Sequence, residues 1–177
     1  MNNTQLLAIS GSLRKHSSNT NVLQAAKKLF STSIDISLYS ELAILPHFNP
    51  DLDRQPLPNT VISLRQQIKN ARGIIISSPE YAHGVPGSLK NALDWLVSSV
   101  EFPYKPVLLI NTNPRATIAL ASLQEILTTM SAKIDEKNDL TLEIAGRGLS
   151  TEDIVKDPEL SASIVKAIDS WCKSIPS

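Results

Sequence analysis

Hydroxyl, amide and cationic side chains crowd into the segment that follows the first apolar run of the chain. That run is Gln5 to Ile9, and the segment GSLRKHSSNT after it is rich in side chains that can donate hydrogen bonds to an anion, among them Ser12, Arg14, Ser17, Ser18, Asn19 and Thr20. A helix that begins here adds unpaired N–H groups and a partial positive charge. The Arg14 guanidinium is a planar, permanently charged fork that suits phosphate. The segment therefore predicts a phosphate cradle between a strand and a helix.

The spacing of this segment excludes two common phosphate sites and leaves one structural alternative. It has neither the G-x-x-x-x-G-K-[ST] pattern of a P-loop nor the G-x-G-x-x-G pattern of a dinucleotide-binding turn. In the structural alternative, Ser18 or Asn19 serves only as the N-cap of the helix, and Lys15 and His16 are solvated. One loop alone leaves both interpretations open.

A second unusual loop follows the most strand-like run of the chain, Gly73 to Ser77. Its sequence, SPEYAHGVPGSLKNALDWL, holds two prolines and two glycines close together, which restrict the backbone. Glu80, Tyr81 and His83 stand where the strand ends. A rigid loop of this kind can offer backbone N–H and C=O groups to the edge of a flat heteroaromatic ring. The alternative is a well-formed turn in which Tyr81 packs and Glu80 is solvated.

Both loops need elements to hold them, and the chain alternates short apolar runs with longer amphipathic segments. The pattern predicts strands at 5–9, 34–38, 73–77 and 106–110 with a fifth within 132–145, and helices from 19, over 60–71, from about 88, and over 116–130 and 158–174. The central strands are apolar throughout, as strands covered on both faces are, whereas 34–38 alternates and is expected nearer the sheet edge. We therefore predict one α/β domain over residues 1–177, with a five-stranded parallel sheet between two helical layers.

The expected sheet brings the two loops together. In such folds ligands bind at the carboxyl ends of the strands, where the winding direction reverses. In the strand order 2-1-3-4-5 this crevice lies between the first and third strands, which precede the two loops. A shared crevice favours a binding role for both loops over the structural alternatives.

The composition limits the size of the domain and the kinds of molecule that it could bind. The chain has 177 residues, 42% of them hydrophobic, which suits one domain with a sizeable core. Seventeen Lys and Arg balance seventeen Asp and Glu, so net charge provides no attraction to nucleic acid or an anionic membrane.

A single cysteine, Cys172, excludes an internal disulfide and fits a reducing cytoplasm. His16 and His47 have no partner at metal-ligand spacing, so no metal is expected. Without a signal peptide or a membrane-span pattern, a soluble cytoplasmic protein is predicted.

The two motifs together resemble the NADPH-dependent FMN reductase family, the flavodoxin-like quinone, azo and chromate reductases. GSLRKHSSN matches the family's G-S-x-R-x-x-S-x-N, and the later segment matches its P-E-Y, P-G, L-K-N and D-W elements. The resemblance covers essentially the whole chain. It implies a three-layer α/β/α flavodoxin-like fold with the strand order 2-1-3-4-5.

The resemblance also implies a cofactor and the residues that hold it. FMN is the expected cofactor, with NADPH or NADH as electron donor. The FMN phosphate is expected at Ser12, Arg14, Ser17 and Asn19, and the isoalloxazine ring at Pro79, Glu80, Tyr81 and His83, with Thr112 as a further contact. Because the cofactor carries the chemistry, no catalytic residue of the chain is predicted. His83 as a proton donor to a reduced quinone is a hypothesis that geometry has to support.

Several positions depart from the family's commoner pattern. Ala82 and Gly84 stand where many members have Asn and Ser, so side-chain contacts expected there are absent or replaced by backbone. The segment NTNPRAT replaces a glycine-rich turn after the fourth strand and leaves the shape of the substrate pocket open. Thr20 stands where a basic residue is often seen, which leaves open the choice between NADPH and NADH.

The predicted function is that of an FMN-dependent NAD(P)H oxidoreductase. It would transfer a hydride from NAD(P)H through bound FMN to a quinone, an azo compound, free flavin or a similar small acceptor, by a ping-pong mechanism. One alternative is a flavodoxin-type electron carrier, which the zero net charge disfavours because such carriers are usually acidic. Another is a domain that binds a different phosphate-bearing ligand or a protein partner without chemistry.

A homodimer or homotetramer is expected by the same resemblance, because family members pair across the third helix and the long helix after the fourth strand. Trp95 and Val97 are then either interfacial or part of the core. Lys90 and Asp94, four residues apart on the third helix, are expected to form a surface ion pair.

Overall fold

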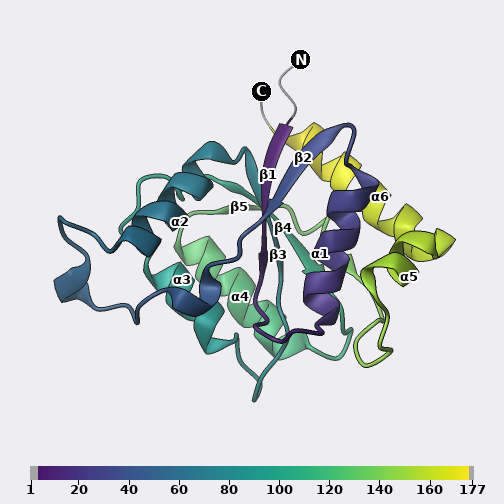
Figure 1. The fold of residues 1–177 in the computed structure, drawn as a ribbon, viewed down its shortest axis with the longest axis horizontal. Helices are drawn as coiled ribbons and strands as arrows, with labels where there is room; N and C mark the ends of the chain where they lie inside the picture. The colour runs from purple at the N-terminus through teal and green to yellow at the C-terminus, as the bar shows by residue number, and fades with distance from the viewer. Residues whose placement is uncertain (1–3, 176–177) are drawn as a thin grey trace.

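A parallel β-sheet forms the centre of the molecule in a computed structural model that describes residues 4–175 (Figure 1). Its strands are β1 (Thr4–Ser10), β2 (Ile34–Leu38), β3 (Gly73–Ser77), β4 (Pro106–Asn111), β5 (Lys133–Ile134) and β6 (Leu140–Thr141). The order is β2-β1-β3-β4-β5, with β6 also paired to β4. All pairs are parallel. The predicted fold class and strand order are confirmed.

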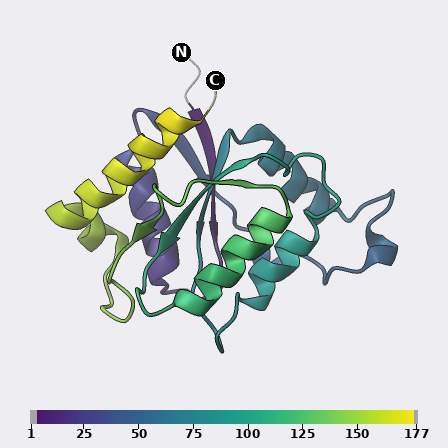
Figure 2. The same cartoon turned by 180° about the vertical axis from the view of Figure 1, so that it is seen from behind.

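Helices cover the sheet on both sides. They are α1 (Ser18–Leu29), α2 (Asn59–Asn70), α3 (Gly87–Asp94), α4 (Thr117–Thr129), α5 (Thr151–Lys156) and α6 (Pro158–Ser174), with short 3-10 turns η1 (Leu42–Ile44) and η2 (Pro50–Leu52). Figures 1 and 2 show α1, α5 and α6 over one face of the sheet and α2, α3 and α4 over the other. Among residues 4–175, no helix is both long and apolar enough to span a bilayer.

Two apolar cores result from the alternation of side chains along each strand. Leu6 and Ala8 of β1 pack under α1, α5 and α6, whereas Leu7 and Ile9 pack under α2, α3 and α4. The central strands are buried on both faces, which explains why their sequences are apolar without a polar interval.

The fifth strand differs from its prediction. Instead of one strand within 132–145, the chain forms two short strands, β5 and β6, separated by the turn 135–139. Between them, a carboxylate takes the place of a strand carbonyl: Asp139 Oδ1 accepts a hydrogen bond from the backbone N–H of Leu109 in β4, at 2.9 Å. A side chain thus pairs with β4 where the backbone of the fifth strand does not. The pattern of apolar residues in the sequence does not indicate this contact.

Two further differences concern helices. The six-residue α5 was not predicted; it begins with a capping box in which the side chains of Ser150 and Asp153 each accept a hydrogen bond from the other's backbone N–H. Trp95 is fully buried, with its ring edge-on to Phe48, so it belongs to the core, while Val97 is 65% exposed. The expected Lys90–Asp94 ion pair is present, with 2.5 Å between Nζ and Oδ1.

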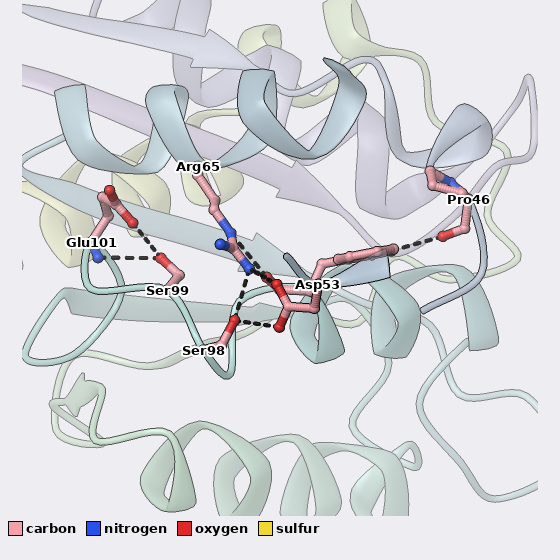
Figure 3. Close-up of polar contacts among 7 residues, drawn as sticks. Pro46, Asp53, Arg65, Ser98, Ser99 and Glu101 are labelled. Atoms are coloured by element: carbon pink, nitrogen blue, oxygen red, sulfur yellow. Dashed lines mark hydrogen bonds and ion pairs between the residues drawn. The ribbon is translucent and has the colours of Figure 1, made fainter. Parts of the chain in front are cut away.

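Arg65 of α2 fastens the long connection between β2 and α2 to the end of α3 (Figure 3). Its Nη2 lies 2.8 Å from Asp53 Oδ1 and also donates to the Ser98 hydroxyl and to the carbonyl of Trp95. The Arg65 and Asp53 side chains are only 15% and 12% exposed. Because the Trp95 carbonyl closes α3, this guanidinium caps the helix that follows the second motif loop.

Candidate functional site

A crevice of about 340 Å³ opens at the carboxyl ends of β1, β3 and β4. Four loops line it, at 12–19, 78–81, 111–116 and 145–148. Both motif loops are among them, as the strand order predicts. A larger hollow of about 590 Å³ lies at the other end of the strands, beside Gln5, Ile34 and Arg72, and holds neither motif. The crevice at the carboxyl ends is therefore the candidate site.

The first turn of α1 presents unpaired N–H groups to this crevice. Ser17, in an extended conformation, is the N-cap, and its hydroxyl accepts from the backbone N–H of Thr20 at 3.4 Å. The backbone N–H groups of Ser18 and Asn19 have no partner in the described part of the chain, as geometry requires of a first turn. The alternative in which Ser18 or Asn19 is the cap is wrong, because the helix begins one residue after Ser17.

Side-chain hydrogen bonds hold this turn against the ends of three strands. Asn19 Oδ1 accepts from the hydroxyl of Ser77, at the end of β3, and from that of Thr112, just after β4, at 2.9 and 3.2 Å. All three residues are buried. The hydroxyls of Ser10, at the end of β1, and Thr20 are 2.8 Å apart. The turn is therefore fixed relative to the sheet.

The loop from β1 to α1 follows a tight path. The N–H of Gly11 donates to the Ser77 carbonyl, and a Cβ on Gly11 would lie 2.6 Å from the Ser78 hydroxyl oxygen, so a larger residue would require the Ser78 side chain to move. Ser12 is buried, and its hydroxyl accepts from the backbone N–H of Arg14 at 3.3 Å. The Arg14 side chain lines the crevice and has no carboxylate partner among residues 4–175. Its charge is available to a ligand.

The loop from β3 to α3 makes a tight hairpin turn of unusual sequence. Tyr81 and Gly84 exchange backbone hydrogen bonds of 3.1 and 2.9 Å. Between them, Ala82 and His83 both have positive φ, at 49° and 58°. Two positive φ values define a type I′ turn, which normally uses Asn-Gly because side chains strain this conformation. Ala82 and His83 thus give the site a strained backbone.

Glu80 connects this loop to the next helix. Its Oε2 accepts from the backbone N–H of Ala119 at 2.9 Å, in the first turn of α4, where the N-cap Ala116 supplies no side-chain cap. Its Oε1 lies 3.0 Å from Nδ1 of His83. The Ala119 hydrogen bond, with smaller contributions from His83, lowers the pKa of Glu80 against the opposing effect of desolvation. Glu80 is therefore a bonded cap rather than a solvated carboxylate.

Eight of the nine expected site residues line the crevice: Ser12, Arg14, Ser17, Asn19, Pro79, Glu80, Tyr81 and Thr112. His83 does not; its side chain is 76% exposed at the tip of the turn. Tyr81 is half exposed rather than packed. Sequence reasoning missed Ser77, whose hydroxyl holds Asn19, and the loop at 145–148. Two closely spaced glycines, Gly146 and Gly148, were the sequence signal for that loop, and both have positive φ in the structure.

The donors at the crevice fit a phosphate group. Unpaired N–H groups, neutral hydroxyls and one uncompensated guanidinium converge there, and the one carboxylate of the described lining, Glu80, is already bonded on both oxygens. Within the described ranges, no group of three or more His, Cys, Asp or Glu side chains could hold a metal ion. The polar end of the crevice suits an organic phosphate, and Tyr81 and Pro79 suit the planar part of such a ligand.

Comparison with known proteins gives consistent matches. The model of the NADPH-dependent FMN reductase family matches residues 4–143. The quinone reductase of Escherichia coli K12 is 36% identical over 140 residues, which span 75% of this chain and 74% of that protein. An NAD(P)H-dependent FMN reductase of Pseudomonas aeruginosa is 34% identical over 111 residues, spanning 62% of this chain and 60% of that enzyme.

Among solved structures, the flavoenzyme NAD(P)H:(acceptor) oxidoreductase FerB of Paracoccus denitrificans is similar over nearly the whole chain. The match has a TM-score of 0.77 and 27% sequence identity, and covers 97% of this chain and 98% of that one. It extends the likeness beyond residue 143 to α5 and α6.

Proposed function

Because the chain belongs to the NADPH-dependent FMN reductase family and is therefore an oxidoreductase that uses FMN and NAD(P)H, we propose that it reduces quinones and similar flat acceptors in a ping-pong reaction. The observation that supports this is the meeting of both family motifs at one crevice, with phosphate donors at one end and a rigid loop at the other. Small-molecule acceptors follow from relatives named quinone reductase.

The phosphate end of the site consists of residues from the loop between β1 and α1. In our proposal, Ser12, Arg14, Ser17 and Asn19 hold the FMN phosphate together with the unpaired N–H groups of the first turn. The helix dipole and the Arg14 charge both favour a dianion there. The hydrogen bonds from Ser77 and Thr112 keep the turn in place, so binding requires little rearrangement.

The ring end consists of Pro79, Glu80, Tyr81 and the turn that His83 completes. When bound, FMN supplies the redox chemistry, because it accepts a hydride from NAD(P)H and gives it up to a second substrate. The protein's part is to orient the ring. Glu80 fixes the loop to α4, and the Tyr81–Gly84 turn places backbone groups at fixed positions.

Proton supply does not require a residue of the crevice. His83 Nδ1 is engaged with Glu80, and its ring lies outside the crevice lining, so the geometry does not favour it as a donor to a reduced acceptor. The crevice is open to water, which can supply the proton. We propose no catalytic residue in the chain itself.

A homodimer or homotetramer in the cytoplasm is part of the proposal. The outer face of α4 supports assembly, because Ile118 there is half exposed and Glu125 is the only charged residue of the helix. Light scattering of the purified protein tests the oligomeric state. The use of a single cysteine supports a reducing compartment.

Anaerobic titration tests the function. The FMN-loaded protein is titrated with NADPH and, separately, with NADH, while flavin absorbance is followed, and a quinone is then added. Bleaching by a nicotinamide and recovery on the quinone are expected, and the two titrations show which nicotinamide is preferred. If FMN binds but neither nicotinamide bleaches it, the chain is an electron carrier. Failure to bind FMN would overturn the site assignment.

A further inference from the structure

The amide of Asn19 is held in one orientation by two buried hydroxyl groups. Ser77 Oγ and Thr112 Oγ1 both lie within hydrogen-bond distance of Asn19 Oδ1, at 2.9 and 3.2 Å. Ser77 is fully buried, Thr112 is 2% exposed and Asn19 is 5% exposed. The three side chains come from the ends of β3 and β4 and the first turn of α1.

The number of available donors and acceptors determines which end of the Asn19 amide faces inward. Each hydroxyl has one proton to donate, and residues 4–175 offer neither of them another acceptor. With Oδ1 inward, its two lone pairs satisfy both donors. With the amide reversed, Nδ2 would face two hydroxyls whose protons had no acceptor, which is costly in a buried site. The inward Oδ1 is therefore the stable arrangement.

The outward end of the amide is then a donor. Asn19 lines the crevice, and no partner of Nδ2 exists within the described residues. Nδ2 is also not sealed from solvent, because Tyr39 Oη is the only buried, unbonded side-chain polar atom of the described chain. Nδ2 thus lies beside the unpaired N–H groups of the same turn and can add one more donor to them.

We propose that Ser77 and Thr112 are positioning residues: they turn the Asn19 amide so that only its N–H₂ group faces the crevice, which selects a phosphate-bearing flavin over an uncharged one. This inference rests on the proposed function, since it assigns the phosphate of FMN to that turn. A reversed amide would place a carbonyl oxygen against the phosphate and repel it. The hydroxyls of Ser77 and Thr112 act through Asn19, because both are bonded to its Oδ1.

The test compares the dissociation constants of FMN and riboflavin, which differ only in the phosphate, by quenching of flavin fluorescence. Asn19→Asp is the sharpest variant, because its inward oxygen still accepts from both hydroxyls while its outward oxygen is an anion. The ratio of riboflavin to FMN dissociation constants is expected to fall by about tenfold or more, with riboflavin binding little changed. An unchanged ratio would overturn the proposal.

Variants of Thr112 separate positioning from packing. Thr112→Val deletes the hydroxyl at nearly constant shape, and the ratio is expected to fall about fivefold. Thr112→Ser keeps the hydroxyl and should retain the wild-type ratio. Ser77→Ala should behave as Thr112→Val does. Ser99→Ala is the matched control, because it deletes another buried serine hydroxyl, bonded to Glu101 outside the crevice, and should leave the ratio unchanged.

The outcomes are distinct. Equal ratios in Thr112→Val and Thr112→Ser would show that the Thr112 hydroxyl has no part in the selection of FMN over riboflavin, and the inference would be overturned. The proposed function would still stand if the wild type bound FMN. If the wild type bound neither flavin, the proposed function would fail and the inference with it. If Asn19→Asp does not fold, the Thr112 pair decides.

Discussion

At the scale of single residues, Arg14 is the cation whose placement is specific. It lines the crevice without a carboxylate partner in the described chain, whereas its neighbour Lys15, which is also exposed, lies outside the lining. Arg14→Gln is expected to weaken FMN binding about tenfold and to leave riboflavin binding nearly unchanged. Lys15→Gln removes the same charge one residue away and is expected to change FMN binding by less than about threefold. Fluorescence titration measures both, and equal losses would refute a directed contact.

The hydroxyl group of Tyr39 is buried without a hydrogen-bond partner in the described chain. Tyr39 follows β2 and is 6% exposed; burial raises its pKa, and the nearby Glu41 adds to this. An unpaired buried hydroxyl is destabilising. Tyr39→Phe is therefore expected to raise the free energy of unfolding by about 1 kcal/mol. Urea denaturation measures it.

Tyr104→Phe is the matched control for Tyr39, since Tyr104 is 71% exposed and its hydroxyl is solvated. Its effect should stay within about 0.5 kcal/mol. A loss of stability in Tyr39→Phe would mean that the hydroxyl has a partner, such as an ordered water.

At the scale of elements, the turn at Ala82 and His83 is the clearest local conflict between sequence and conformation. Ala82 has φ 49°, a left-handed conformation that costs a residue with a Cβ roughly 1–2 kcal/mol. Ala82→Gly relieves this strain but adds freedom to the unfolded chain, so the free energy of unfolding is expected to rise by about 0.5 kcal/mol.

The same substitution on a helix should have the opposite sign. Ala162 is exposed on α6, away from the proposed subunit interface, and Ala162→Gly is expected to lower the free energy of unfolding by about 1 kcal/mol. Chemical denaturation of the two variants gives the comparison. If Ala82→Gly destabilised as much as Ala162→Gly, the turn would not be strained.

The positions of helices and strands could be predicted wherever burial alone determined the pattern of apolar residues. Gly73 to Ser77 is apolar because both faces of β3 are buried, and its predicted bounds match the structure. The fifth strand could not be predicted in the same way, because the carboxylate of Asp139 replaces a backbone group and leaves no apolar pattern. Likewise α5 is short, and its capping box is a weaker signal than a run of helical periodicity.

The candidate site was predictable in its loops but not in its internal bonds. Both loops stand out by composition, and the strand order brings them together. Ser77, in contrast, reads as the last residue of a buried strand, and nothing in its neighbours indicates that its hydroxyl meets Asn19. Glu80 was expected beside a ring, and its bond to Ala119 of α4 needed the tertiary structure. Long-range pairs of this kind have no local signature.

At the scale of the whole molecule, Asp139 gives stability a dependence on pH. It is partly buried, and desolvation raises its pKa against the opposing hydrogen bonds from Leu109 and Gln124. A carboxyl whose folded pKa is raised favours the fold most below its unfolded pKa, and this stability is lost as pH rises through the folded pKa. Asp139→Asn keeps an acceptor for Leu109 without the charge.

The melting temperature of Asp139→Asn is therefore expected to exceed that of the wild type at pH 7, and the difference should shrink as pH falls below the ordinary pKa of aspartate, about 4. Thermal unfolding across this range measures it. Asp51→Asn, at an exposed position, is the control and should show no such trend. A variant less stable than the wild type at pH 7 would show that the ionised form is the favoured one.

The interrupted fifth strand also bears on how the protein avoids aggregation. The sheet ends on the side of β4 in two strands of two residues each, with a turn and a carboxylate between them. An intact edge strand would offer a continuous row of N–H and C=O groups to the sheet of another molecule. Short edge strands and charges turned into the ladder are how natural proteins prevent such pairing. The side chain that breaks the regularity of the sheet thus also keeps that edge from serving as a template for fibre growth.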